Sequence, residues 1–197
     1  MSKAAQTRQF IIERTAPVFN KKGFAGTSLS DMAEATGLTK GSIYGNFENK
    51  EEVALAVYRH NTGQLSKNKE AWIAGHKDAH SRLIALVDFY RQNWKPIFEN
   101  GGCPILNAAT ESDDTMPPMK ARVKMTFESW EKNISRIIQD GIKEEAFKPE
   151  INTADYACLF VMMIEGGILR SKIADSPDKL YLVLDRIVKI INEEIVR

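Results

Sequence analysis

Cysteine and histidine are scarce in this chain of 197 residues, which contains two cysteines and three histidines. A disulfide framework needs several cysteines and a zinc ribbon needs CxxC pairs, so Cys103 and Cys158 can form neither. His76 and His80 lie four positions apart, but a solvated polar turn explains them better than a metal site. No Ser/His/Asp set, carboxylate pair or phosphate loop has a usable spacing. The sequence therefore predicts no metal, no cofactor and no enzyme, and it leaves Cys103 as either an accessible thiol or a buried small residue.

Long apolar runs and export signals are also missing. The longest uninterrupted apolar run spans residues 156–164, whereas a membrane helix needs about 20 apolar residues. Lys3, Arg8, Glu13 and Arg14 interrupt any hydrophobic segment of a signal peptide within the first twenty residues. The low cysteine content favours a reducing compartment. We therefore expect a cytoplasmic protein with no membrane partner.

No segment alternates apolar and polar residues as a strand does, and no internal repeat or low-complexity segment is present. Apolar residues instead recur every three or four positions, which predicts an all-α fold of about nine helices. The last helix carries the clearest apolar stripe, made of Leu180, Val183, Leu184, Ile187, Val188, Ile191 and Ile195. Residues 155–170 are apolar nearly all round, so we expect this helix to lie between its own core and a partner subunit.

Glycine and proline mark the helix boundaries. A helix expected at about residues 80–98 ends at Gly101-Gly102, and a long helix that ends near residue 145 begins at Pro117-Pro118. At about residue 50, short capped helices give way to long apolar ones. We therefore predict a boundary between two domains here, residues 1–50 and residues 51–197.

The net charge of +1 hides an asymmetry along the chain. Residues 1–50 contain seven Lys and Arg side chains against four Asp and Glu, a net charge of +3. Residues 51–197 contain 20 against 22, a net charge of −2. A basic N-terminal segment followed by an acidic remainder is typical of a protein that binds a polyanion through its N-terminal part.

The first helix is expected at residues 3–22, with a kink at Pro17. Its core contacts are expected to be Phe10, Ile12, Ala16 and Phe19. Gly23 suits the left-handed conformation that ends a helix.

Two short capped helices follow, separated by a glycine turn. Ser28 and Asp31 form an acidic capping box for a helix that ends at Gly37, and Thr39 caps the next helix. Two short helices around one glycine-centred turn predict helix-turn-helix geometry. The second helix begins with hydroxyls, a cation and little bulk, which suits an approach to DNA phosphates. Caps and a glycine turn also occur in any helical corner, so spacing alone leaves a purely structural role open.

Residues 23–57 read GFAGTSLSDMAEATGLTKGSIYGNFENKEEVALAV. This segment resembles the DNA-binding segment of TetR-family transcriptional regulators. The resemblance covers the G-F-x-x-T-S entry, the A-x-x-x-G turn, the T-K-G-x-I-Y recognition helix and the F-x-x-K-E-E start of the fourth helix. Gly45 and Asn46 depart from the family's usual bulky residue followed by His, and Pro17 is a second departure. Glycine costs about 1 kcal/mol of helix propensity relative to alanine, so we expect a recognition helix that is short or becomes ordered on DNA.

The resemblance implies a homodimer whose recognition helices enter successive major grooves of a palindromic double-stranded DNA operator. It also implies that residues 1–50 are the helix-turn-helix DNA-binding domain and that residues 51–197 form the ligand-binding and dimerisation domain. A small-molecule effector in the larger domain would change the separation of the recognition helices. The resemblance implies phosphate contacts at Thr27, Ser28 and Lys50. The residues that it places in the groove are Thr39, Lys40, Gly41, Ser42, Tyr44 and Asn46, with Lys40 and Asn46 the best candidates for base edges.

The larger domain is rich in aromatic and sulfur side chains, which form either an adaptable apolar pocket or ordinary core. The residues expected to line a ligand pocket are Phe89, Trp94, Asn107, Phe127, Trp130, Phe160 and Met163. The effector expected for such a pocket is apolar or aromatic and carries one polar group.

These features favour a ligand-responsive transcriptional regulator that acts as a repressor. One alternative is a helical small-molecule carrier or scaffold that retains the helix-turn-helix as a packing element, and a helical enzyme is a third. Salt-dependent DNA binding with a sequence preference would distinguish the transcriptional regulator from the carrier or scaffold. The lack of an acid–base pair in the sequence argues against the enzyme.

Overall fold

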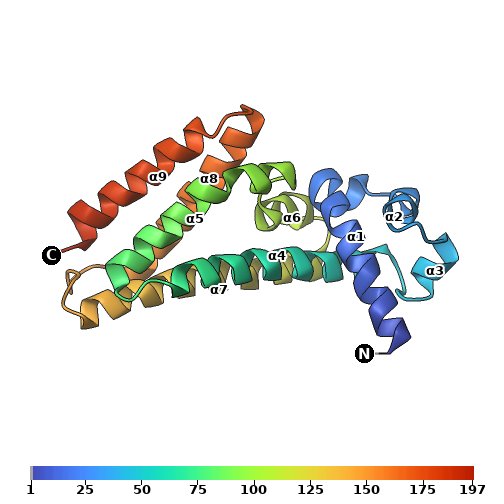
Figure 1. The fold of residues 1–197 in the computed structure, drawn as a ribbon, viewed down its shortest axis with the longest axis horizontal. Helices are drawn as coiled ribbons and strands as arrows, with labels where there is room; N and C mark the ends of the chain where they lie inside the picture. The colour runs from blue at the N-terminus through green and yellow to red at the C-terminus, as the bar shows by residue number, and fades with distance from the viewer. Residues whose placement is uncertain (1) are drawn as a thin grey trace. The chain divides into compact units, whose positions relative to one another are not determined.

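The computed structural model describes residues 2–197 and contains nine α-helices and a short π-helical turn (Figure 1). Their bounds are α1 (Lys3–Gly26), α2 (Leu29–Thr36), α3 (Lys40–Tyr44), α4 (Lys50–Ala74), α5 (Ala79–Glu99), α6 (Pro104–Ser112), α7 (Pro117–Lys143), α8 (Thr153–Ile173), α9 (Asp178–Ile190) and η1 (Ile191–Ile195). The predicted all-α fold of about nine helices is confirmed. Within residues 2–197, no helix is both long and apolar enough to span a lipid bilayer.

The chain folds into two compact units. The first contains the described residues up to Leu65 together with Asn100–Lys124, and the second contains Ser66–Glu99 and Met125–Arg197. Helices α4 and α7 each contribute to both units. Residues 100–124 thus pack with the N-terminal helices, a grouping that a boundary at residue 50 does not describe. The assignment of functions to residues 1–50 and 51–197 stays a prediction.

Helix α1 organises the first unit, where it packs on α2 and α6. Its core side is built from residues four apart, Ile11, Thr15 and Phe19, together with Ala16. The expected core contact at Phe10 is wrong, because this side chain is 40% exposed and its neighbour Ile11 faces the core. Pro17 lies within α1 and the non-helical dihedral angles of this helix occur at Gly23, so the kink expected at Pro17 stays a prediction.

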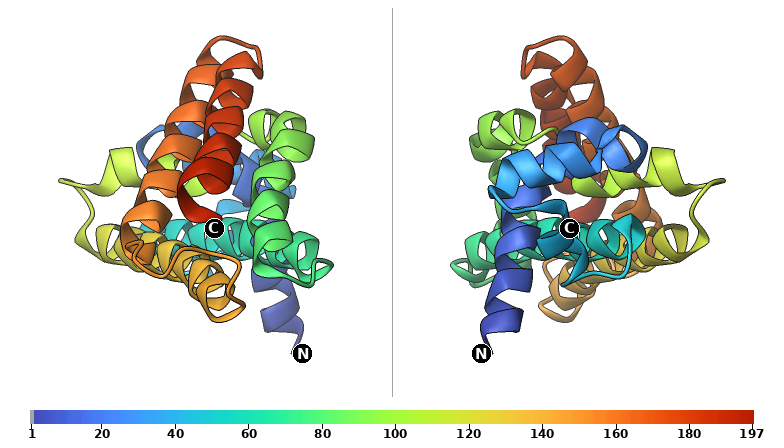
Figure 2. Two further views of the ribbon diagram at one scale, coloured as in Figure 1. Left: turned by 90° about the vertical axis from the view of Figure 1, so that its left-hand side faces the viewer. Right: turned by 90° about the vertical axis from the view of Figure 1, so that its right-hand side faces the viewer.

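Helices α8 and α9 form the main contact of the second unit and lie side by side in every view (Figure 2). The predicted apolar stripe is confirmed along α9 and into η1, with Leu180, Leu184, Ile187 and Ile191 fully buried. Helix α8 buries one apolar face through Phe160, Ile164 and Ile168. Its other side remains apolar but uncovered in this chain.

The loop between α5 and α6 settles the alternatives for Cys103. Its side chain is 3% exposed, so it is a buried small residue and not an accessible thiol. Cys158 on α8 is half-buried, and burial raises the pKa of its thiol. Neither thiol has the electropositive, accessible setting of a reactive cysteine.

Candidate nucleic-acid interface

Helix α2 begins in the predicted capping box. The backbone amide of Asp31 donates to Ser28 Oγ over 3.1 Å, and Asp31 Oδ2 accepts from the amide of Ser28 over 2.7 Å. Lys22 Nζ, at the end of the regular part of α1, lies 2.5 Å from Asp31 Oδ1. The hydrogen bond from Lys22, followed by those from Ser28, holds the pKa of the Asp31 carboxyl well below its usual value of 3.8. The start of α2 is therefore tied to α1 as well as capped.

Helix α3 is short and presents two different faces. Thr39 Oγ1 caps it by accepting from the amide of Ser42 over 3.1 Å, as predicted. The helix ends at Tyr44, with Gly45 as its C-cap, so the expectation of a short recognition helix is confirmed. Ile43 is fully buried, whereas Tyr44 is 45% exposed. The buried face anchors the helix, and the polar face lies open to solvent.

A clamp from α1 holds the segment that follows α3. Arg8 Nη2 lies 2.6 Å from Glu52 Oε1, and Arg8 Nη1 donates to the backbone carbonyl of Asn46. The same guanidinium lies 3.9 Å from the centre of the Phe47 ring. The Glu48 amide and, second, Arg8 lower the pKa of Glu52. No local sequence pattern indicates this clamp, because its partners lie 38 and 44 positions from Arg8.

Most of the residues predicted to contact DNA lie on the open side of these helices. Those classed as exposed are Ser28, Thr39, Lys40, Gly41 and Tyr44. Ser42, Asn46 and Lys50 are half-buried. Lys50 Nζ lies 4.6 Å from the centre of the Phe24 ring and 3.5 Å from the carbonyl oxygen of Ala25.

Two predicted contacts fit the structure less well. Thr27 is fully buried, and its hydroxyl donates to the carbonyl of Gly23 over 2.6 Å, so its side chain does not present itself to a phosphate. The side-chain amide of Asn46 donates to the carbonyl of Ser42 over 2.8 Å. That bond uses one N–H of the amide and restricts its orientation. Lys40 and Tyr44 are better placed to contact DNA bases.

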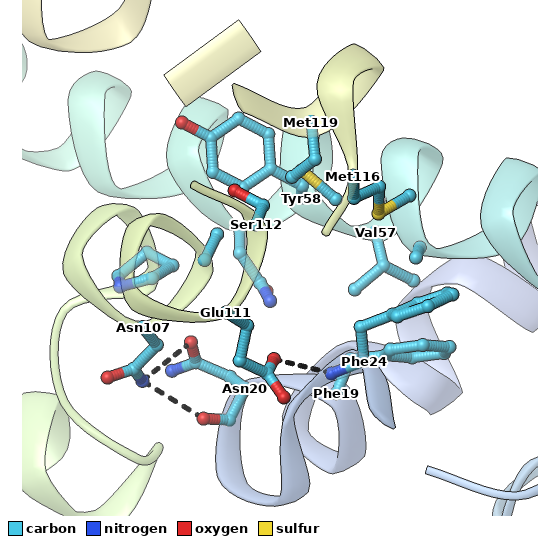
Figure 3. Close-up of a pocket in the computed structure, with 14 residues that line it drawn as sticks. Phe19, Asn20, Phe24, Val57, Tyr58, Asn107, Glu111, Ser112, Met116 and Met119 are labelled. Carbon is cyan, nitrogen blue, oxygen red and sulfur yellow. Dashed lines mark hydrogen bonds between the residues drawn. The ribbon is translucent and has the colours of Figure 1, made fainter. Parts of the chain in front are cut away.

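The first unit also contains a cavity, which we call the N-terminal cavity. Apolar side chains supply most of its wall, among them Phe19, Phe24, Val57, Tyr58, Met116 and Met119 (Figure 3). Its polar lining consists of Asn20, Asn61, Asn107, Glu111 and Ser112. The empty volume is about 480 Å³, part of which is open to solvent.

The seven residues predicted to line a ligand pocket do not surround one space. Asn107 lines the N-terminal cavity, and Trp130 lines a second cavity in the second unit. The other five line neither of these cavities: Phe89, Trp94, Phe127, Phe160 and Met163. Phe89 and Phe160 are instead 4% and 0% exposed. Trp94, Phe127 and Met163 are half-buried, so only part of the predicted set lies fully on inward helix faces, and the ligand pocket stays a prediction.

The second cavity has a mixed lining of charged and apolar side chains. Lys69 Nζ lies 4.1 Å from the centre of the Trp130 ring, and Arg82 forms ion pairs with Asp140 and Glu144 at 3.2 and 3.4 Å. Among residues 2–197, no three His, Cys, Asp or Glu side chains gather as metal ligands.

Comparison with known proteins assigns both parts of the chain. Residues 11–57 match the profile of the bacterial regulatory proteins of the tetR family, and residues 79–187 match that of the tetracyclin repressor-like C-terminal domain. The chain is 24% identical over 173 residues to the HTH-type transcriptional repressor DhaR of Mycobacterium sp. (strain GP1). That match covers 88% of this chain and 86% of the relative.

Solved structures agree over the whole length. The transcriptional regulator of the TetR family from Cytophaga hutchinsonii is 39% identical with a TM-score of 0.95, and the match covers 100% of this chain and 98% of that one. A TetR transcriptional regulator from Chloroflexus aurantiacus J-10-FL is 33% identical with a TM-score of 0.94, covering 100% and 99%.

Proposed function

Because the chain belongs to the TetR family of helix-turn-helix transcriptional regulators, a non-enzymatic family, we propose that it is a ligand-responsive repressor. In this proposal a homodimer binds a palindromic operator, and a small apolar or aromatic effector releases it. The observation that carries the proposal is the open polar face of α3 on a rigidly held helix pair. Residues 1–50 take the DNA-binding role, and residues 51–197 take ligand binding and dimerisation.

Four side chains of this interface have proposed roles in DNA binding. The ammonium of Lys40 and the phenol of Tyr44 extend from the open face of α3, where they read base edges in the major groove. Ser28 at the start of α2 and Lys50 at the start of α4 hold phosphates, which position the helix without reading sequence. The buried side chain of Thr27 keeps a structural role.

Dimerisation is assigned to the uncovered apolar face of α8 and α9. Met162, Leu169 and Ile173 are 60%, 43% and 74% exposed, and they follow each other at spacings that place them on one side of α8. Gly166 lies on the same side and has open space above it. Leu182 on α9 is 67% exposed. Covering apolar side chains of this size yields about 1.5–3 kcal/mol each, so a second copy of the same face is a favourable partner.

Selection of operator DNA tests the proposal directly. The full-length protein is incubated with a random-sequence duplex library, and the enriched sites are then measured at several salt concentrations. We expect two inverted half-sites whose centres lie about 34–36 Å apart, the spacing of successive major grooves. Affinity should fall steeply with salt because each phosphate contact releases a counterion.

A control duplex with one half-site scrambled should bind far more weakly than the palindrome. If every duplex bound equally at each salt concentration, the repressor assignment would fail. The helix-turn-helix would then serve as a packing element in a carrier or scaffold.

A further inference from the structure

The N-terminal cavity is lined by residues that are distant in sequence but all belong to the first unit. Its wall takes Phe19 and Phe24 from α1, Val57 and Tyr58 from α4, and further residues from α6 and α7. Figure 3 shows Glu111 between the two phenylalanine rings on one side and the Asn20–Asn107 pair on the other. A molecule in this cavity would therefore touch α1 and α6 at the same time.

One polar group in the wall has no partner. Ser112 is 3% exposed, and its hydroxyl makes no hydrogen bond within residues 2–197. A buried hydroxyl without a partner is costly, because it has lost water and gained nothing in return. Ser112 lines the cavity, so a molecule bound there can supply the missing bond.

The charge of the wall limits which molecules fit. Glu111 is the only charged residue among those that line the cavity, and no lysine or arginine is among them. A carboxylate or phosphate in this apolar space would meet Glu111 without a compensating cation. A hydrogen-bond donor such as an amine or a hydroxyl would instead find two acceptors, the Glu111 carboxylate and the Ser112 oxygen.

Glu111 also accepts hydrogen bonds from the backbone at the end of α1, just before the DNA-binding helix α2. Glu111 Oε2 accepts from the amide of Phe24 over 2.6 Å, and Oε1 accepts from the amide of Ala25 over 3.4 Å. These amides directly follow Gly23, where φ of 75° and ψ of 176° interrupt α1. A Cβ atom at Gly23 would lie 2.2 Å from Glu111 Oε1, so glycine is required for the contact as well as for the conformation. The carboxylate thus stabilises the turn that leads into α2.

We propose that the N-terminal cavity is the effector site, that it takes a small apolar molecule carrying a hydrogen-bond donor, and that Glu111 transmits its occupancy to α2. This inference rests on the proposed function as a ligand-responsive repressor. The donor of the bound molecule competes with the Phe24 and Ala25 amides for Glu111. The turn before α2 then loses its acceptor, and the capped helix pair leaves the orientation that fits DNA.

The expected change in operator affinity follows from the thermodynamic linkage between effector binding and DNA binding. An effector releases DNA only if it binds the released conformation more tightly than the DNA-binding one. Couplings of this kind usually change affinity by about 5- to 150-fold. We expect operator affinity to fall within that range when the cavity is filled.

Three probes of matched size and different charge test the ligand class without DNA. They are 2-phenylethylamine, 2-phenylethanol and phenylacetate, each titrated into the full-length protein and followed by NMR. We expect the amine and the alcohol to bind at least about 10-fold more tightly than the carboxylate. Equal or tighter binding of phenylacetate would overturn the assigned ligand class.

Hydrogen exchange tests the role of Glu111 in the same samples. The amides of Phe24 and Ala25 should exchange several-fold faster when the amine is bound, whereas exchange at the Ser28 cap should change less. If their exchange were unchanged or slower at saturation, Glu111 would not transmit occupancy. Because neither measurement involves DNA, a failed operator selection and a failed cavity assignment are told apart.

Three variants separate ligand binding from folding. Ser112→Ala should be at least as stable as the wild type, because it removes an unsatisfied buried hydroxyl, yet bind the alcohol about 5-fold more weakly. Glu111→Gln keeps an amide oxygen as acceptor and should lose the preference for the amine over the carboxylate. Ala108→Leu fills the cavity and should abolish binding of both, while Ala121→Leu at an exposed position of α7 should not. Unchanged binding in Ser112→Ala and Ala108→Leu would place the ligand elsewhere.

Discussion

The α2–α3 pair and the α8–α9 pair are held in place by different kinds of interaction. At the N-terminal pair, side chains bond to backbone amides three residues away, as at Ser28 and Thr39. At the C-terminal pair, fully buried leucine and isoleucine side chains of α9 pack against α8. The first arrangement fixes the direction of two short helices, and the second buries a large area between two long ones.

The exposed surfaces of the two pairs also differ, since one is polar and the other apolar. The N-terminal pair exposes hydroxyls, an ammonium and a phenol around α3. The C-terminal pair exposes methionine, leucine and isoleucine along α8. The first suits a hydrated polyanion, whereas the second gains most when another apolar surface covers it. Substitutions should therefore act on DNA binding at one pair and on assembly at the other.

The largest effect is expected on the apolar side of α8. Met162→Glu places a carboxylate in each half of the proposed interface, where it removes apolar contact and adds two like charges. The dimer dissociation constant should rise by roughly 100-fold or more, which corresponds to about 3 kcal/mol. Sedimentation velocity from nanomolar to micromolar concentration measures it.

The matched control is Met125→Glu, which makes the same change at a methionine on α7 that is 58% exposed. It should leave the dissociation constant unchanged. A wild-type chain that sediments as a monomer at micromolar concentration would contradict the proposed dimer, and equal effects of the two substitutions would place the interface elsewhere.

At the polar surface, Lys40→Ala and Tyr44→Ala should each weaken binding to the selected operator by about 5- to 150-fold, or 1–3 kcal/mol. Both residues are exposed, so helicity and dimerisation should not change. Fluorescence anisotropy with labelled operator measures the loss. Lys21→Ala removes a charge from an exposed position of α1 and serves as control. If the three variants lost affinity equally, α3 would not be the element that enters the groove.

The part of the interface that the sequence predicted depends on short-range geometry. The caps at Ser28 and Thr39 each satisfy an amide three residues ahead, so both partners stand in one short motif. The stripe of α9 was readable for a similar reason, since its spacing follows from the pitch of one helix. The contacts of Arg8 and Glu111 were not predicted, because each joins segments at least 38 positions apart.

The predicted ligand pocket shows a second limit of reasoning from helix periodicity. Periodicity identified Phe160 and Trp130 as inward-facing, and both are indeed buried. Whether an inward face is packed or hollow depends on the volumes of all its neighbours, which no single helix encodes. The N-terminal cavity exists where α1, α4, α6 and α7 contribute side chains that do not fill the space between them.

A smaller effect is expected from the capping box itself. Ser28→Ala removes the acceptor for the amide of Asp31 and should lower the free energy of unfolding by about 1 kcal/mol. Urea denaturation followed by circular dichroism measures the difference. Ser30→Ala, at an exposed position two residues further on in the first turn of α2, should cost little. Equal losses in both variants would mean that the cap adds nothing beyond helix propensity.

The smallest effect is a dependence of stability on pH that arises at Asp31. Its folded-state pKa lies below the ordinary value of 3.8, first because Lys22 donates a hydrogen bond to it and then because Ser28 does. A depressed pKa stabilises the fold above pH 3.8, and this contribution is lost as the pH falls from there through the folded-state pKa. The difference in unfolding free energy between the wild type and Asp31→Asn should therefore be constant from about pH 5 upward and shrink below pH 3.8. Urea titrations at closely spaced pH values measure this difference, with Glu34→Gln on the same helix as control for the loss of one carboxylate. A difference that stayed constant down to pH 2, or one that grew on acidification, would show that the bond between Lys22 and Asp31 does not contribute to holding α2 against α1.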